Sequence, residues 1–319
     1  MPGEKTGEKF YITTAIDYVC RPVPPGDAHV GIMTELTKEQ LQDLYITKGL
    51  STWKIERLSG RSRSFVYAQL RKFGIPPRDI SDSHVHYERK PFGGSGADKA
   101  YLIGFTIGDL RVRRNGGSRS KTISIACAST KPAQIELIER LYMPYGRIWK
   151  SRPNSRGVVS IEAFVDLSFG FLLPQNIKEG VDSIFTKIFI KDEYFLSFIA
   201  GFTDAEGSAF ISKNQATLSW GNYNQKILKR TKVKLAEMGI RTRKIVCDHL
   251  TGYQGKDGYR RSADYYHLSC GRKESLWRLL ILLNPLLRHI DRRKAVERAL
   301  RNIRIRNRMY GFINFAKKL

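Results

Sequence analysis

A short segment that occurs twice, 97 residues apart, constrains the fold of this chain more than any other feature. Residues 101–109 read Tyr-Leu-Ile-Gly-Phe-Thr-Ile-Gly-Asp, and residues 198–206 read Phe-Ile-Ala-Gly-Phe-Thr-Asp-Ala-Glu. In each copy an acidic residue, Asp109 or Glu206, follows the central glycine by five positions. Self-similarity at a fixed offset is typical of a duplicated structural unit. The segment therefore predicts two copies of one supersecondary plan within a single chain.

Each copy continues through the same predicted elements. A strand, a helix and a basic strand follow both motifs, over residues 122–127, 134–143 and 146–150 in the first copy and 216–220, 225–238 and 239–244 in the second. Apolar residues recur at helical spacing in the helices and alternate in the strands. The order helix, strand, strand, helix is thus expected twice, and it indicates an α+β protein.

The motif helices have small residues at positions where two helix backbones could meet. Gly104 and Gly108 lie four residues apart in the first helix, as Gly201 and Ala205 do in the second, so each pair shares one helical face. Small residues on facing helices permit close packing of their backbones. Packing about a pseudo-two-fold axis would place both acids side by side at one end. Two adjacent carboxylates need a cation, and hard oxygen ligands favour Mg²⁺, which can activate a water molecule.

The charge of the chain points to a polyanionic partner. Its 319 residues include 55 Lys and Arg against 30 Asp and Glu, a formal net charge of +25. An excess of this size favours nucleic acid, because neutralised phosphates release their counterions. No apolar run approaches the roughly 20 residues that span a bilayer, and the first residues lack the apolar core of a signal peptide. We expect no membrane association, and a protein that works inside the cell.

The cysteines and histidines are too scattered for a structural zinc site. The chain has no Cys-x-x-Cys pair, and zinc sites require paired ligand spacings. The four cysteines are Cys20, Cys127, Cys247 and Cys270. Thiols in a reducing compartment are the favoured interpretation.

Residues 36–75 form a separate pattern of three short helices. A Ser or Thr precedes each helix and a Gly follows it, the caps being Thr37, Ser51 and Ser62 and the breaks Gly49, Gly60 and Gly74. A tight turn before a third helix flanked by basic residues resembles a helix-turn-helix unit that binds DNA. Arg61, Arg63 and Arg71 would then face DNA. The alternative is a small bundle that serves only packing.

These observations divide the chain into six parts. The predicted parts are an irregular lead-in (1–35), a helix-turn-helix domain (36–80), a linker (81–98), the first repeat (99–192), the second repeat (193–306) and a C-terminal tail (307–319). The linker ends in the sequence Pro91-Phe-Gly-Gly-Ser-Gly96, a composition typical of flexible connections.

The two motifs and the plan around them resemble the LAGLIDADG homing endonucleases in their single-chain, two-repeat form, over residues 99–305. The second motif, Ala200 to Gly207, is the closer match, whereas the first has Leu110 where the family usually has Gly. The resemblance implies two pseudo-symmetric αββαββα repeats whose four-stranded sheets form a saddle over the DNA major groove. It also implies metal-dependent cleavage of both strands of a long, asymmetric duplex target, with 3′ overhangs and with Mg²⁺ or Mn²⁺ as the cofactor.

The resemblance also assigns roles to residues of the repeats. Asp109 and Glu206 correspond to the metal-binding acids, and Asn222 to a polar residue that organises water, with Ser129 or Thr130 as its counterpart in the first repeat. Basic residues that polarise the scissile phosphate would come from Lys244, Arg292 or Lys150. The predicted catalytic set is Asp109, Glu206, Asn222, Lys244 and Arg292.

Further cations of the repeats are predicted to contact DNA, mostly at phosphates. They lie on predicted strands and hairpins: Arg111, Arg113, Arg114, Lys121, Arg147, Lys150, Arg152, Arg156, Lys213, Arg241, Arg243, Arg260 and Arg261.

Two other functions remain open at the level of sequence. One is an intron RNA maturase on the same saddle, and the other is a DNA-binding regulator that does not cleave. Both acids are present, which favours the endonuclease, and two repeats in one chain favour a monomer. The resemblance places such a chain in a cytoplasm or nucleoid, or in an organelle that encodes it. An intein origin is disfavoured, because no splicing-type residues frame the chain.

Overall fold

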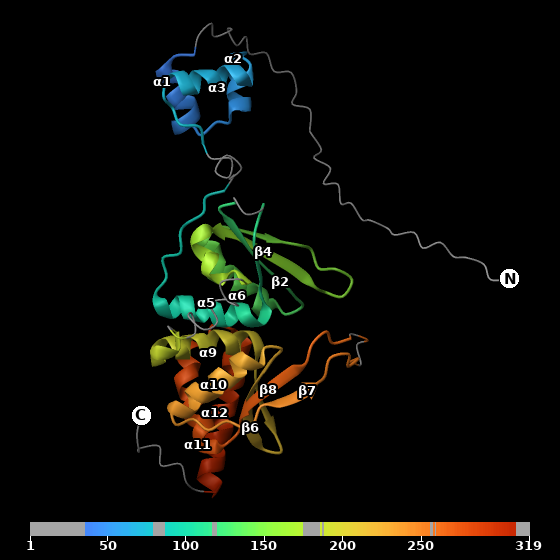
Figure 1. Ribbon diagram of the computed structural model, residues 1–319. Helices are drawn as coiled ribbons and strands as arrows, with labels where there is room; N and C mark the ends of the chain where they lie inside the picture. Colours follow the sequence, from blue (N-terminus) through green and yellow to red (C-terminus); the bar gives the residue numbers. More distant parts are fainter. Residues whose placement is uncertain are drawn as a thin grey trace, which may run out of the picture. The chain divides into compact units, whose positions relative to one another are not determined.

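The computed structural model describes residues 36–78, 87–116, 120–174, 186, 188–255, 258 and 260–310 (Figure 1). The predicted lead-in 1–35 and the end of the predicted tail lie outside the described residues. The chain forms two compact units that divide between residues 79 and 80. Among the described residues, no helix combines the length and the hydropathy that a membrane crossing requires.

The described part of the N-terminal unit, residues 36–78, contains three short helices and one π-helical turn. Its elements are α1 (Lys38–Gln42), the π-turn η1 (Asp43–Thr47), α2 (Thr52–Ser59) and α3 (Arg63–Lys72). The hydroxyls of Thr37, Ser51 and Ser62 accept hydrogen bonds from the first turns of these helices, so all three predicted caps are confirmed. Gly60 ends α2 with φ +68°, a conformation that favours glycine.

A small core of its own holds the N-terminal unit together. Leu41, Ile55, Val66 and Leu70 are fully buried, one or more from each helix. Apolar burial of this kind is the dominant stabilising term for so small a unit. The three predicted helices are therefore confirmed as a folded body, whereas a DNA-binding role for this body stays a prediction.

The larger unit contains the same strand order twice. The first copy comprises α5 (Gly96–Asp109), β1 (Arg111–Arg114), β2 (Thr122–Ser129), α6 (Pro132–Tyr142), β3 (Arg147–Lys150) and β4 (Val159–Asp166). The second comprises α9 (Asp192–Glu206), β5 (Gly207–Ser212), β6 (Gln215–Asn222), α10 (Gln225–Glu237), β7 (Val246–His249), β8 (Tyr265–Cys270), α11 (Lys273–Leu283) and α12 (Ile290–Tyr310). Both sheets are four-stranded and antiparallel, in the orders β1-β2-β4-β3 and β5-β6-β8-β7. The prediction of an α+β fold with a duplicated plan is confirmed.

Each sheet has one face covered by helices and one face that we call the open face. In the first sheet, Ile123 and Ile125 of β2 are buried against the helices. Arg111 and Arg113 are in register with Ala126 and Ser124, which point to the opposite face, and both arginines are exposed there. In the second sheet Leu218 and Trp220 are buried on the helical side. The alternation places a polar surface on the open faces.

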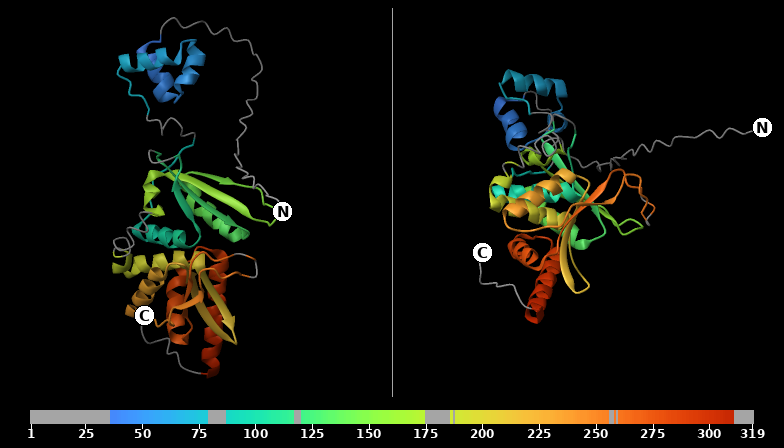
Figure 2. Two further views of the ribbon diagram at one scale, coloured as in Figure 1. Left: turned by 45° about the vertical axis from the view of Figure 1, so that its right-hand side comes forward. Right: turned by 60° about the horizontal axis from the view of Figure 1, so that its bottom comes forward.

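The two motif helices α5 and α9 lie side by side in all views (Figure 1, Figure 2). A Cβ atom on Gly104 would lie 2.0 Å from the backbone oxygen of Phe198, and one on Gly201 would lie 2.0 Å from the backbone oxygen of Tyr101. Neither backbone can yield, so both positions require glycine. The predicted close packing of the two helices is confirmed, and it joins the repeats into one core.

The segment that precedes α5 differs from the predicted flexible linker. The Lys90 amide donates to the Tyr145 carbonyl at 2.9 Å, and the Phe92 ring packs edge-on against Phe169, with centroids 5.2 Å apart. Ser95 caps α5, which begins at Gly96 rather than at 99. A Cβ atom on Gly94 would lie 2.6 Å from the Phe92 ring, so glycine here serves close contact rather than flexibility.

One further element departs from the prediction. Residues 239–244 were expected in a basic strand, but β7 begins only at Val246. The Arg243 amide still donates to the Ser269 carbonyl of the neighbouring strand at 2.8 Å. In the first repeat, a 3₁₀-helix (Leu167–Leu172) follows β4, and residues 174, 186 and 188–190 are α-helical.

The residue after each motif helix has the same conformation in both repeats. Leu110 and Gly207 are both extended, with φ −105° and −72°. Because neither φ is positive, leucine can replace the usual glycine at 110 without backbone strain.

Candidate active site

The two acids of the repeated motif share one cavity at the C-terminal ends of α5 and α9. The cavity has a volume of about 520 Å³. Its lining includes both acids, the N-terminal turns of α6 and α12, and the end of β2: Asp109, Cys127, Ala128, Ser129, Lys131, Gln134, Ala205, Glu206, Ala209, His289, Asp291, Arg292, Ala295 and Arg298. The glycine contact between the helices therefore brings together residues that are 97 positions apart in sequence.

Burial makes both carboxyl groups hold their protons more tightly, and at Glu206 the charge of Asp109 adds to this effect. Burial, together with the nearby charge of Asp109, raises the pKa of Glu206 from its ordinary 4.5 to about 7. Burial likewise raises the pKa of Asp109, against the opposing effects of Arg292, Lys131 and a hydrogen bond from Gln134. Two acids so placed have a free-energy cost when both are ionised, which a cation between them would remove.

The cavity is rich in donors, some beside Asp109 and one beside Ala205. The Gln134 side-chain amide donates to Asp109 Oδ2 at 2.9 Å, and Lys131 lies directly before α6. Arg292, in the first turns of α12, donates to the Ala205 carbonyl at 3.3 Å. These groups could orient an anionic oxygen beside the acids.

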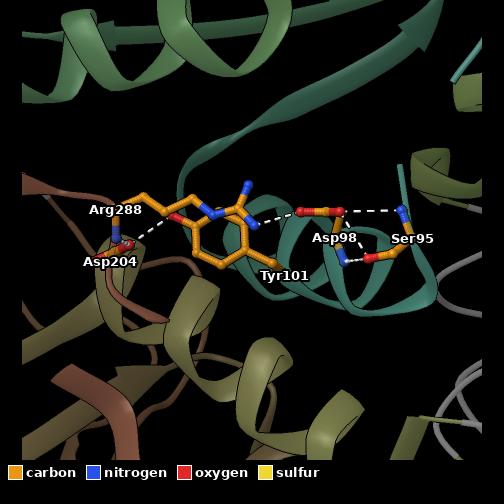
Figure 3. A network of polar contacts seen from close by, with 5 residues as sticks. All are labelled: Ser95, Asp98, Tyr101, Asp204 and Arg288. Atoms are coloured by element: carbon orange, nitrogen blue, oxygen red, sulfur yellow. Dashed lines mark hydrogen bonds and ion pairs between the residues drawn. The ribbon is translucent and has the colours of Figure 1, made fainter. Parts of the chain in front are cut away.

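A buried carboxylate fixes the chain segment that leads into α12. Asp204 is fully buried, and its Oδ2 accepts hydrogen bonds from the Tyr101 hydroxyl at 2.6 Å and from the backbone amides of Arg288 and His289 at 2.7 and 3.1 Å (Figure 3). His289 and Arg292 form one wall of the cavity. By binding the backbone at residues 288 and 289, Asp204 fixes the position of this wall relative to Glu206. In the first motif the matching position holds Ile107.

The Arg288 side chain extends this network to the other motif helix. It bonds to Asp98 Oδ1 at 2.6 Å and lies over the Tyr101 ring, 4.2 Å from the centroid (Figure 3). Asp98 in turn accepts from the backbone and hydroxyl of Ser95 at the start of α5. The network connects α5, α9 and the segment before α12 through paired charges and hydrogen bonds.

The other predicted catalytic residues lie in different places. Arg292 lines the cavity with both acids, but Asn222 is buried outside the lining, where its oxygen accepts from the Asn224 amide at 2.8 Å. Lys244 is exposed and is not part of the cavity. Lys150 pairs with Glu139 of α6 at 2.7 Å, on the helical face of the first sheet.

Sequence reasoning missed Lys131 and Gln134. The only available signal was their position, at the start of a predicted helix that follows a strand. Nothing in the local sequence indicates that this end of α6 faces Asp109, since that contact depends on how the helix packs.

The predicted DNA contacts separate into groups by their location. Arg111, Arg113 and Arg147 are exposed on the open face of the first sheet, whereas Arg114, like Lys150, lies in register with the helical face. The remaining predicted contacts lie in turns, hairpins and irregular segments of the larger unit or on the N-terminal unit: Lys121, Arg152, Arg156, Lys213, Arg241, Arg243, Arg260, Arg261, Arg61, Arg63 and Arg71.

The carboxyl pair suits a cation that the substrate helps to bind. No group of three or more His, Cys, Asp or Glu residues that could enclose a metal occurs within the described ranges. Mg²⁺ is commonly bound by one or two carboxylates together with substrate phosphates and water. Asp109 and Glu206 fit that pattern, because the cavity has room beside them for phosphate and water.

Comparison with known proteins gives similarities of fold only. No protein-family model matches the chain, and no curated protein matches its sequence. A crystal structure of I-DmoI in complex with DNA and Ca is 18% identical, over 64% of this chain and 98% of that one, with a TM-score of 0.43. Full-length DUF199/WhiA from Thermotoga maritima is 18% identical, over 71% and 66%, with a TM-score of 0.42.

The N-terminal LAGLIDADG domain of DUF199/WhiA is also similar, at 17% identity over 60% of this chain and 83% of that one, with a TM-score of 0.38. I-DmoI is described as a homing endonuclease and has also been crystallised with DNA and Mn. At these identities, and with TM-scores below 0.5, the likeness adds nothing about the activity of this chain.

Proposed function

We propose that this chain is a metal-dependent DNA endonuclease of the LAGLIDADG type, which cuts both strands of a long, asymmetric duplex and leaves 3′ overhangs. The observation that carries the proposal is the convergence of Asp109 and Glu206, one from each repeat, in a single cavity with Arg292 and Lys131. A structural scaffold gains nothing from two repelling, partly buried acids, since replacing either would lower the energy of the fold.

The chemistry follows from the groups that line the cavity. Mg²⁺ or Mn²⁺ between the acids would lower the pKa of a water molecule and neutralise charge on a phosphate. Arg292 and Lys131 hold the non-bridging oxygens of that phosphate in position. Gln134 fixes the orientation of the Asp109 carboxylate. Because the pKa of Glu206 is about 7 without a cation, about half of the molecules carry this proton at neutral pH, and a cation bound beside the acid would displace it.

The rest of the chain supplies the affinity for DNA. The net charge of +25 and the arginines on the open face of the first sheet favour binding to a phosphate backbone. In the N-terminal unit, Arg63, Tyr67 and Arg71 lie along the exposed side of α3 and line a shallow hollow there. We propose that α3 reads additional base pairs, and that the chain acts as a monomer.

A cleavage assay tests the proposal directly. Duplexes are enriched from a random-sequence library by binding to the full chain in EDTA, and are then incubated with Mg²⁺, with Mn²⁺ or with EDTA. We expect double-strand cuts only with the metals. Glu206→Gln should reduce the rate at least about 100-fold while binding stays within a few-fold, since several kcal/mol of transition-state stabilisation come from the metal site.

Glu139→Gln is the matched control, because Glu139 pairs with Lys150 away from the cavity. It should cut at the wild-type rate. Tight binding without cleavage in either metal would overturn the endonuclease, and preference for structured RNA over the enriched duplex would favour a maturase instead.

A further inference from the structure

On the open face of the second sheet, a tyrosine has an unused hydroxyl. Tyr265 begins β8 and is half-buried on that face. Burial, with a smaller contribution from the charge of Glu206, raises the pKa of Tyr265 to about 12. Tyr265 is not part of the lining of the cavity that holds the two acids.

A glycine creates the space that Tyr265 occupies. A Cβ atom on Gly221 would lie 2.2 Å from the Tyr265 hydroxyl oxygen and 2.8 Å from His267 Nε2. Gly221 lies on β6, in register with His267 on β8. Any other residue at this position would push the phenol away from the sheet, so the backbone of β6 determines where the hydroxyl lies.

Neighbouring rings fix the orientation of the phenol. Tyr223 packs edge-on against Tyr265 with centroids 4.9 Å apart, and His267 does so at 5.4 Å. Arg261 donates to the Tyr223 hydroxyl at 3.0 Å and lies 5.8 Å from the Tyr265 centroid. A side chain held from three sides presents its hydroxyl in one direction.

That hydroxyl has no hydrogen-bond partner among the described residues, whereas the Tyr266 hydroxyl donates to Asp264 at 3.2 Å. A phenol that keeps its proton up to a pH of about 12 is a neutral donor. A donor without a partner on a face that we propose to lie against DNA suits a phosphate oxygen, the most frequent acceptor in protein–DNA complexes.

We infer that Tyr265 donates to a backbone phosphate of the DNA strand that lies over the second sheet, and that the two strands meet unequal groups: a neutral phenol on the open face of the second sheet, and Arg111 and Arg113 on that of the first. The inference rests on the proposed function for its substrate. A charge-assisted hydrogen bond is about twice as strong as a neutral one. The strand over the second sheet is therefore cut more slowly, and nicked duplex accumulates before the double-strand break.

The first test does not depend on cleavage. The full chain is labelled with 3-fluorotyrosine, and the resonances of Tyr265 and Tyr266 are assigned by their loss in Tyr265→Phe and Tyr266→Phe. In EDTA, the enriched duplex should shift the Tyr265 resonance and leave that of Tyr266, on the opposite side of β8, unchanged. An unchanged Tyr265 resonance in the bound complex would overturn the inference, whether or not the protein cuts DNA.

The second test uses the duplex with each strand labelled separately, in Mg²⁺. Tyr265→Phe keeps the packed ring and should slow one strand about tenfold while the other stays within twofold, and Tyr266→Phe should change neither. Gly221→Ala, which displaces the hydroxyl, should reproduce the effect. Equal slowing of both strands would overturn the inference. A shifted Tyr265 resonance without any cleavage would support the phosphate contact and overturn the endonuclease.

Discussion

The two repeats share a strand order and a motif helix, yet the residues around their acids are different. Beside Asp109 lie a lysine and a glutamine at the start of α6, whereas the corresponding turn of α10 starts at Asn224. Buried Asp204 in the second motif has Ile107 as its counterpart in the first. The helix contact is reciprocal, while the surroundings of the acids are not. A duplicated scaffold inside one chain permits this, because each half can change without its copy changing too.

The reciprocal part of the comparison should show the largest effects. Gly104→Ala and Gly201→Ala each place a Cβ atom 2.0 Å from a backbone oxygen of the other helix. We expect each to lower the free energy of unfolding by about 3 kcal/mol or more, because the backbone cannot relax as a side chain can. Urea denaturation measures this loss. Gly93→Ala, with nothing within 4 Å of its Cβ, is the control. A large loss of unfolding free energy for only one of the two variants would show that the helix contact is not reciprocal.

Making the second motif like the first should have the next largest effect. Asp204→Ile removes the acceptor of three hydrogen bonds and leaves the Tyr101 hydroxyl and two amides without it. Unsatisfied buried donors cost about 1–3 kcal/mol each, partly recovered by relaxation, so we expect a loss of roughly 3 kcal/mol. Asp204→Asn should lose less, since its amide oxygen still accepts. Equal stability of Asp204→Ile and the wild type, measured by thermal unfolding, would contradict the anchoring role.

The raised pKa of Glu206 should link the stability of the fold to pH. Because the folded state raises the pKa of Glu206 to about 7, its contribution to stability is complete below pH 4.5 and is lost as the pH rises through 7. Without metal, Glu206→Gln should therefore match the wild type near pH 4.5 and exceed its stability at pH 8 by roughly 1–3 kcal/mol. Thermal unfolding in EDTA across this range tests the prediction. Added Mg²⁺ should stabilise the wild type and not the variant.

The smallest effects concern the open faces of the two sheets. The first presents Arg111 and Arg113, whereas β5 and β6 of the second present Ser208 and Ser219 in register. We expect Arg113→Gln to reduce the dependence of log affinity on log salt concentration by about 1, and Ser219→Ala to leave it unchanged. Lys150→Gln, on the helical face, should also leave the slope unchanged. A reduced slope for Lys150→Gln would support the DNA contact that the sequence predicts for Lys150 and contradict this expectation.

Sequence patterns predicted the parts of the molecule that depend on local rules. The caps Ser51 and Ser62, the strand and helix after each motif, and the meeting of the motif helices through Gly104 and Gly201 all follow from spacing and residue type. Asp109 and Glu206, predicted to lie side by side at the ends of these helices, line one cavity, whereas their role as metal ligands stays a prediction.

The remainder depends on contacts between distant residues. Gly94 and Gly96 read as a flexible connection, but they admit the Phe92 ring and the Tyr194 hydroxyl at distances that a Cβ atom would not allow. The resemblance gave Lys244 a catalytic role, which stays a prediction; the residue is exposed and lies outside both β7 and the cavity that holds the acids. Neither the packing at Gly94 and Gly96 nor the position of Lys244 could be read from the few residues around each of them.

The contact of α5 and α9 at Gly104 and Gly201 also determines how far a change in the angle between the helices moves the two acids. The acids lie five residues beyond Gly104 and Gly201, which is about 7.5 Å at 1.5 Å of rise per residue. A tilt of one helix by about 10° around the crossing would shift its acid by roughly 1.3 Å, enough to alter what the pair can bind. Substitutions near Gly96 and Tyr194, at the far ends of the same helices, can therefore tune the separation of the acids without touching the cavity.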